Sequence, residues 1–334
     1  MGSVQSSAGF HSQILPDEFT RRIVVLGKTG AGKSSLTNTL FGEKVCETNH
    51  SPTSGTAKCQ AESRIVNGRS VTVIDTPGFF DTGRSEEEMK VEIVRCITEC
   101  APGPHVFIIV LKVEKYTEQE NEVINRMADY FSDDALRFAT VLFTHGDQLP
   151  EGEKIEEFVR KSKDLSHVVR KCGNRCNVID NKYWNNNWDE YRSNQFQVEE
   201  LLITMDTIIK ANNKGYYTHE MLQKVKRSIE EEEDRLKEDD EMPSLCEIRE
   251  KSKAVARATL LHDVSGLNTR ALLKIFLSGS MKLVTTEDGV IPGHGATFTS
   301  RTVAVPTGEG ATDGPTSSDA EAASKDEKAA EHLK

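Results

Sequence analysis

The chain has 334 residues, a formal net charge of -11 and an isoelectric point near 5.4. Hydrophobic residues make up 37% of it and aromatic residues 6%, so we expect part of the chain to lie outside a packed core. The acidic balance argues against nucleic acid as a partner, because such binding needs a basic surface. The seven cysteines, an odd number, are expected to be reduced thiols in a cytosolic protein.

Residues 1–20 are polar and without period, and we expect them to be disordered. The start, Met1-Gly2-Ser3-Val4-Gln5-Ser6, fits the loose N-myristoylation pattern, and the alternative is a polar N-terminus or a cloning remnant. The sequence holds no run of 18 apolar residues. We therefore expect a cytoplasmic protein, with peripheral association with intracellular membranes as a further option.

Short apolar runs alternate with amphipathic patterns over residues 21–213. Strands are predicted at 23–26, 64–66, 71–74, 106–111, 138–143 and 176–179, and helices at 34–41, 86–99, 118–131, 155–169 and 198–209. Asn67-Gly68 separates two of the strands and predicts a hairpin. This order predicts an α/β fold with a mostly parallel six-stranded sheet, flanked by helices and carrying one antiparallel edge.

The pattern changes after residue 213. Helical spacing continues over 216–237 and 244–261, with Pro243 between them, which predicts a helical extension over 214–284. The apolar patch 273–277 is interpreted as a helix end, with a weak interfacial anchor as the alternative. Residues 285–334 are rich in Gly, Thr, Ser and Ala, and we expect a disordered tail.

A glycine-rich loop, Gly27-Lys28-Thr29-Gly30-Ala31-Gly32-Lys33-Ser34, matches the P-loop pattern between a predicted strand and a predicted helix. Glycines let backbone N–H groups turn toward phosphates, and the helix N-terminus adds a positive dipole. Lys33 reaches the β- and γ-phosphates, and the Ser34 hydroxyl ligates Mg²⁺. The predicted nucleotide-binding residues of this loop are Gly27, Lys28, Thr29, Gly30, Ala31, Gly32, Lys33, Ser34 and Ser35.

The segment Asp75-Thr76-Pro77-Gly78 follows the third predicted apolar strand. A carboxylate at this strand end holds Mg²⁺, usually through water, and the Gly78 N–H senses the γ-phosphate. One hydroxyl between Ser51 and Cys59 should complete the metal shell. The residues alone leave four candidates open, namely Ser51, Thr53, Ser54 and Thr56.

The identity of the nucleotide's base is predicted from the segment Thr144-His145-Gly146-Asp147, which follows another buried strand. The Asp147 carboxylate can accept from guanine N1–H and from the exocyclic amine, a donor pair that adenine lacks. His145 is expected to stack on the base, and the alternative is a loop histidine without a ligand role. Asn181, after the last strand, is the candidate for a second base contact. The expected ligands are therefore GTP or GDP together with Mg²⁺.

Together these residues resemble the GTPase of immunity-associated protein (GIMAP) family, which belongs to the septin-like branch of the P-loop GTPases. The match rests on the P-loop, on Thr144-His145-x-Asp147, and on the box Ala101-Pro102-Gly103-Pro104-His105-Val106 with Tyr116-Thr117-Glu118-Gln119-Glu120. The resemblance implies an AIG-type G domain of the Ras-like fold over 21–213, with Thr56 as the switch threonine and Asn181 as the last base contact.

The resemblance also implies partners and a place of action. Members of the family form nucleotide-dependent dimers across the nucleotide face, so a homodimer or oligomer is expected, with a heterodimer of related members as a further option. The family acts in immune cells and on intracellular membranes.

One departure from the family concerns catalysis. Hydrolytically active relatives carry an arginine before Tyr-Thr, thought to act across the dimer, and this chain has Lys115 there. An arginine finger is worth about 10³–10⁵ in rate. Phe79 and Phe80 follow Gly78, where a glutamine is absent. We therefore expect a slow GTPase, with a non-hydrolysing GTP-gated scaffold as the alternative; Lys115 is otherwise a solvated surface lysine.

An ATP-using enzyme of the P-loop class is a third option. It is disfavoured, because Asp147 would then have no purpose.

Overall fold

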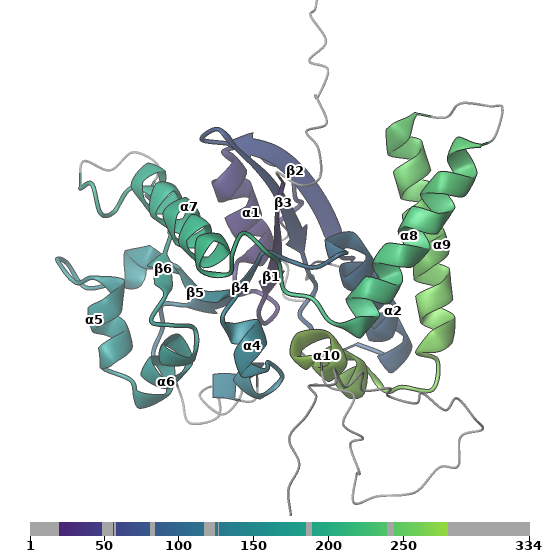
Figure 1. Ribbon diagram of the computed structural model, residues 1–334. Coiled ribbons are helices and arrows are strands. Elements are labelled where there is room, and N and C mark those ends of the chain that lie inside the picture. The colour runs from purple at the N-terminus through teal and green to yellow at the C-terminus, as the bar shows by residue number, and fades with distance from the viewer. Residues whose placement is uncertain are drawn as a thin grey trace, which may run out of the picture. The chain divides into compact units, whose positions relative to one another are not determined.

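A computed structural model of the chain describes residues 20–48, 56, 58–80, 84–116, 124–125, 127–184, 189–238 and 244–279. Its six strands form one sheet in the order β2-β3-β1-β4-β5-β6. The strands are β1 (Arg21–Leu26), β2 (Gln60–Val66), β3 (Arg69–Asp75), β4 (Val106–Lys112), β5 (Ala139–Thr144) and β6 (Cys176–Val178). Neighbours pair in parallel except β2 and β3, which confirms the predicted α/β fold (Figure 1).

The hairpin between β2 and β3 turns at Asn67 and Gly68, as predicted. Both residues have positive φ angles, 46° and 75°, which is the geometry of a two-residue turn between twisted antiparallel strands. β2 is longer than the predicted segment 64–66, since it begins at Gln60. Because β2 is an edge strand and mostly exposed, its first residues are polar and form no apolar run from which a strand could be predicted.

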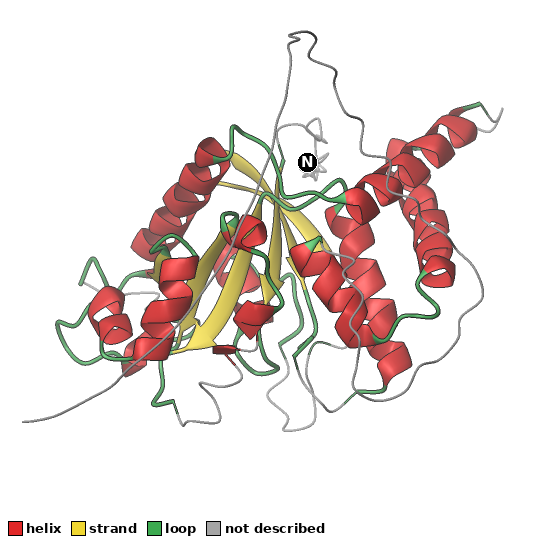
Figure 2. Cartoon of the chain, turned by 60° about the horizontal axis from the view of Figure 1, so that its bottom comes forward, coloured by secondary structure: helices red, strands yellow, loops and turns green. Residues whose placement is uncertain are grey.

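Helices cover both faces of the sheet (Figure 2). On one face, Ile23 and Val25 of β1 pack with residues of α1 (Lys33–Phe41) and α7 (Asn194–Ala211). On the other, Val24 and Leu26 face the core formed with α2 (Glu86–Cys100), α4 (Asp133–Leu136) and the helices that follow β5. Alternate residues of β1 thus point to opposite faces, and both faces are apolar because both are covered.

The predicted helix 155–169 is wrong as a single element. The structure has two helices here, α5 (Ile155–Arg160) and α6 (Lys163–Lys171). The Ser162 side chain accepts a hydrogen bond from the Leu165 N–H at 3.3 Å and caps the second helix. Most of the first half of the predicted helix 118–131 lies outside the described residues, and 124–125 and 127–129 are helical.

The predicted extension consists of α8 (Glu220–Lys237), α9 (Leu245–Asp263) and α10 (Thr269–Ser278). Figure 1 shows α8 and α9 side by side, and α9 and α10 both contact α2. α10 buries Leu272, Leu273, Ile275, Phe276 and Leu277, so the apolar patch is part of a packed helix, as predicted, and not an interfacial anchor. The predicted N-terminal and C-terminal tails, 1–20 and 285–334, lie almost entirely outside the described residues.

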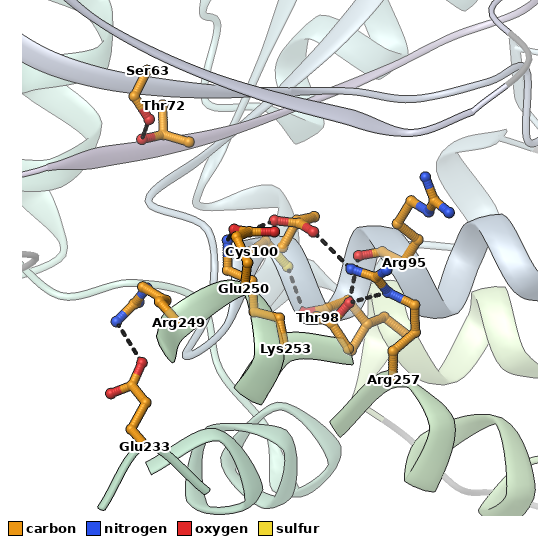
Figure 3. Close-up of polar contacts among 12 residues, drawn as sticks. Ser63, Thr72, Arg95, Thr98, Cys100, Glu233, Arg249, Glu250, Lys253 and Arg257 are labelled. Atoms are coloured by element: carbon orange, nitrogen blue, oxygen red, sulfur yellow. Dashed lines mark hydrogen bonds and ion pairs between the residues drawn. The ribbon is translucent and has the colours of Figure 1, made fainter. Parts of the chain in front are cut away.

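Ion pairs attach α9 to α2. The Glu99 carboxylate, with a side chain only 10% exposed, accepts from Lys253 Nζ at 2.8 Å and from Arg257 Nη2 at 2.9 Å. Figure 3 shows Lys253 and Arg257 reaching from α9 toward the end of α2 that carries Thr98. Arg249 of α9 also pairs with Glu233 of α8 at 3.3 Å. Because one largely buried carboxylate of α2 pairs with two basic side chains of α9, these ion pairs fix the register between the two helices.

The linker before α8 lies on the segment before β4. The Tyr217 N–H donates to the Pro104 carbonyl at 2.9 Å, and the Thr218 hydroxyl donates to the Pro102 carbonyl at 3.1 Å. The backbone approaches so closely that a Cβ on Gly103 would stand 1.8 Å from the Tyr217 carbonyl oxygen. Because 216–218 are held in this way, α8 begins at Glu220 and not at the predicted residue 216.

In the part of the chain that the structure describes, no helix has both the length and the apolar character needed to cross a bilayer. The division of the chain at residue 213 stays a prediction.

We expect Gly103→Ala to destabilise the protein by about 2 kcal/mol or more, because the added Cβ forces the linker away from the sheet. Urea unfolding followed by circular dichroism measures the change. Gly266→Ala is the matched control, since a Cβ there meets nothing within 4 Å. Equal unfolding midpoints for Gly103→Ala and the parent would contradict this account of the linker.

Candidate nucleotide-binding site

The loops that follow β1, β5 and β6 meet at the carboxyl edge of the sheet, where they line a pocket of about 1200 Å³. This is the edge at which open α/β sheets bind ligands. The predicted residues that line the pocket are Thr29, Gly30, Gly32, Lys33, Ser34, Ser35, Thr56, His145, Asp147 and Asn181. Segments up to about 150 residues apart in sequence are therefore brought together by the parallel strand order.

The P-loop joins the end of β1 to the start of α1. Gly32 has a φ of 89°, and a Cβ there would lie 3.0 Å from Asn181 Nδ2 and 3.2 Å from Thr144 Cγ2. Only glycine takes this conformation in this space without strain. α1 begins at Lys33 with no acidic residue in its first turn, so the positive end of the helix dipole faces the pocket uncompensated.

The Lys33 side chain folds back over the loop. Its Nζ donates to the Gly27 carbonyl at 3.0 Å and to the Lys28 carbonyl at 2.8 Å, and the residue is 5% exposed. An ammonium held in this way stands beside the loop amides. The positive charge and the helix N-terminus together suit an anion with several oxygens.

Three oxygen-bearing side chains meet beside the P-loop. The Ser34 hydroxyl lies 2.5 Å from Asp75 Oδ2 and 2.7 Å from Thr56 Oγ1. Asp75 is 1% exposed, and its Oδ1 has no hydrogen-bond partner among the residues that the structure describes. Burial raises the pKa of Asp75, against the opposite effects of the Ser34 hydroxyl and the Lys33 charge.

A hard divalent cation fits this cluster, since oxygen is the ligand type that Mg²⁺ takes in proteins. Among the four hydroxyls left open by the sequence, Thr56 lies at the cluster. Ser51, Thr53 and Ser54 lie outside the described residues.

The two other residues predicted to act on phosphate, Gly78 and Lys115, are not among those that line the pocket. Gly78 is buried in the segment after β3, where the neighbouring Thr76 hydroxyl donates to the Val25 carbonyl at 2.6 Å. Lys115 is exposed on the loop after β4 and does not line the pocket.

The Thr144 side chain supports the P-loop from below. It is fully buried, and its Oγ1 lies 2.8 Å from the Ala31 carbonyl and 3.2 Å from the Leu111 carbonyl. Its neighbour His145 is exposed in the pocket, with a left-handed φ of 60° and its Nδ1 3.0 Å from the same hydroxyl. Thr144 thus ties two loops together, while the His145 ring borders the pocket.

Asp180 is a site residue that the sequence analysis did not select. It is 2% exposed and accepts from the backbone N–H groups of Asp147 at 3.3 Å, of Lys182 at 2.9 Å and of Tyr183. It therefore joins the Asp147 loop to the loop that carries Asn181. The signal for it was an aspartate directly after a buried strand, beside the residue that was chosen.

The two carboxyl groups influence each other. Burial and the adjacent Asp180 raise the pKa of Asp147. Burial acts to raise the pKa of Asp180 too, but hydrogen bonds from Asp147 and from the backbone outweigh it, and the pKa of Asp180 is lowered. Asp180 therefore holds the negative charge, and Asp147 is the partner whose ionisation is more costly.

Asn181 lies between the P-loop and α1. Its Oδ1 is 2.9 Å from the Thr39 hydroxyl, and its Nδ2 is 3.5 Å from the Gly32 carbonyl. Beneath this end of the pocket Trp184, 2% exposed, packs on Gly146 and leaves no room there for a side chain. Trp184 was also missed, since nothing in the spacing of the sequence places it under the loop.

The sequence pattern of the AIG1 family matches residues 21–237, well over half of the chain. Immune-associated nucleotide-binding protein 7 of Arabidopsis thaliana is 34% identical over 213 residues, which cover 62% of this chain and 67% of that protein. GTPase IMAP family member 8 of Homo sapiens is 29% identical over 198 residues, 59% of this chain and 29% of its own length. The chain belongs to the AIG1 family.

Among solved structures, Toc33 from Arabidopsis thaliana in complex with GDP and Mg²⁺ aligns over 57% of this chain and 84% of its own, with 22% identity and a TM-score of 0.44. The match to the human relative covers less than a third of that protein.

We expect affinity for guanine nucleotides to fall as the pH decreases, beginning at a higher pH than an ordinary aspartate would give. The Asp147 carboxylate must be ionised to accept from the base, its pKa in the free protein is raised, and bound N–H donors lower it, so binding releases a proton. Equilibrium titration with fluorescent GDP across mildly acidic to neutral pH measures the trend.

Asp180→Asn should move this fall in affinity to lower pH, because the neighbouring carboxylate that raises the Asp147 pKa is gone. Asp134→Asn, an exposed carboxylate paired with Arg137, is the control. An affinity that stays flat with pH in the parent, or a fall at the same pH in both variants, would count against this coupling.

Proposed function

We propose that this protein binds GTP and GDP with Mg²⁺ and hydrolyses GTP slowly, in an assembly formed across the nucleotide face. One observation carries the proposal. A single pocket edge gathers a P-loop with Lys33, the oxygen cluster around Ser34, and the Asp147 carboxylate. Relatives of this chain include a protein named as nucleotide-binding and one named as a GTPase, which supports the same proposal.

At the phosphate end, the loop amides and the N-terminus of α1 bind the phosphate oxygens, and Lys33 leaves its carbonyl partners to reach the β- and γ-phosphates. Ser34, Thr56 and Asp75 would hold Mg²⁺, Asp75 with its unpaired Oδ1. The ion, when bound, offsets the charge that develops on the phosphates during transfer.

At the base end, the Asp147 carboxylate accepts from guanine, and its loop is held by Asp180. His145 borders the base, and Asn181 contacts it from the P-loop side. This arrangement selects guanine over adenine by requiring two adjacent donors, and a site that demands a donor rejects an analogue without it strongly.

Two features support slow turnover. Phe79, directly after Gly78, is 6% exposed and packs in the core, so it offers no polar group to orient water. Lys115 is a point charge where active relatives are expected to carry an arginine, and a point charge cannot bridge two phosphate oxygens. Because Lys115 is exposed and does not line the pocket, we infer that any action on a phosphate would come from a second copy.

The same two features favour a second candidate, a GTP-gated scaffold that assembles without cleaving the nucleotide. The two candidates share the binding site and differ in chemistry.

We expect phosphate release per molecule to increase with protein concentration, because assembly would bring Lys115 of one copy to the nucleotide of another. Multiple-turnover phosphate release over a range of concentrations measures it. Light scattering with GDP and with a non-hydrolysable GTP analogue shows whether assembly follows the triphosphate. Assembly with the analogue but a flat, background rate of release favours the scaffold.

We expect Lys33→Ala to weaken GTP binding by roughly 10- to 100-fold, the range for a hydrogen bond to a charged group. Asp147→Asn should lose selectivity for GTP over ATP, since the amide offers one acceptor and repels one donor. Competition of fluorescent GTP with unlabelled GTP or ATP measures both, with the exposed Lys237→Ala as control. Parent-like selectivity in Asp147→Asn would refute the base assignment.

A further inference from the structure

Arg84 lies at the oxygen cluster although no motif points to it. Its Nη2 donates to the Thr56 backbone carbonyl at 2.5 Å, across 28 residues of sequence. Both residues are partly buried. A hydrogen bond from a guanidinium to a carbonyl is charge-assisted, and partial burial shields it from competing water.

Thr56, which accepts from Arg84, also contacts the predicted metal site. Thr56 Oγ1 is 2.7 Å from Ser34 Oγ, which is 2.5 Å from Asp75 Oδ2. Arg84 therefore holds the backbone of the same residue whose hydroxyl faces the cluster. Fixing the carbonyl limits the directions in which that hydroxyl can point.

Arg84 itself stands next to a well-anchored helix. Ser85 caps α2 through a reciprocal pair with Glu88. Glu86, in the first turn, accepts from the Thr269 N–H of α10 at 3.0 Å. The guanidinium is thus presented from a fixed helix start, which is what a residue that positions another requires.

We propose that Arg84 is a positioning residue for Thr56, and that it selectively favours the Mg²⁺–GTP complex over the Mg²⁺–GDP complex. The selectivity arises because the Thr56 hydroxyl joins the metal together with the γ-phosphate, which GDP lacks. This inference rests on the proposed function and adds to it a same-chain arginine at the phosphate end, where Lys115 departs from the family pattern.

The test measures binding without turnover. The Mg²⁺ concentration that gives half-maximal binding is determined for a fluorescent non-hydrolysable GTP analogue and for fluorescent GDP. We expect Arg84→Ala to raise this concentration about tenfold or more for the analogue and to leave it unchanged for GDP. Arg84→Lys, which keeps a charged donor, should restore part of the loss.

Two comparisons make the result specific. Arg137→Ala, an exposed arginine paired with Asp134, should behave as the parent. Thr56→Ala should show the same selective shift as Arg84→Ala, and the double variant should shift no further, because both substitutions remove one interaction.

An equal shift for both nucleotides would reduce Arg84 to a structural role, and no shift, or additive shifts in the double variant, would equally overturn the proposal. If Arg84→Ala does not fold, Arg84→Gln serves the same comparison. A parent protein that binds neither nucleotide would instead overturn the proposed function, and this inference with it.

Discussion

The buried carboxylate of Asp75 is the constraint around which the phosphate end is arranged. It is 1% exposed; one oxygen accepts from Ser34, and the other has no partner within the described part of the chain. An ionised carboxylate in such a place is costly unless it is paired, which is why we propose a bound cation there. Ser34 contacts Asp75 directly, Thr56 contacts Ser34, and Arg84 contacts the Thr56 carbonyl.

The base end and the phosphate end are parts of one structure. The Thr144 hydroxyl meets the Ala31 carbonyl of the P-loop, and Asn181 lies against Gly32. Asp180 then links the loops of Asp147 and Asn181 through backbone N–H groups. These hydrogen bonds connect the P-loop with the residues that we propose to contact the base.

The C-terminal helices α9 and α10 are attached to α2. Glu99 pairs with Lys253 and Arg257, and the segment at Gly103 receives the linker that leads to α8. The residues before β4 that carry the family resemblance, 101–106, thus contact that linker through hydrogen bonds to the Pro102 and Pro104 carbonyls. Glu92 of α2 accepts from the Cys59 N–H, and Glu86 of α2 accepts from the Thr269 N–H, so the segment that follows Thr56 and the extension contact the same helix.

Residues close together in sequence determined much of this protein. The P-loop, the hairpin at Asn67-Gly68, the apolar strands and the helical patch over 273–277 could all be predicted, because each depends on local conformation or on a short period of burial. The break between α5 and α6 is also local, since Ser162 caps α6, but the helical spacing over 155–169 gave no sign of it. The positions of Thr56, Asp180, Trp184 and Arg84 depended on neighbours brought near by the fold.

The features that could be predicted are each determined by a few consecutive side chains. The positions that could not be predicted depend on distances between segments far apart in sequence, as between Arg84 and Thr56 or between Asn181 and Gly32. No spacing along the chain encodes those distances, since they follow from the order in which parallel strands are placed side by side.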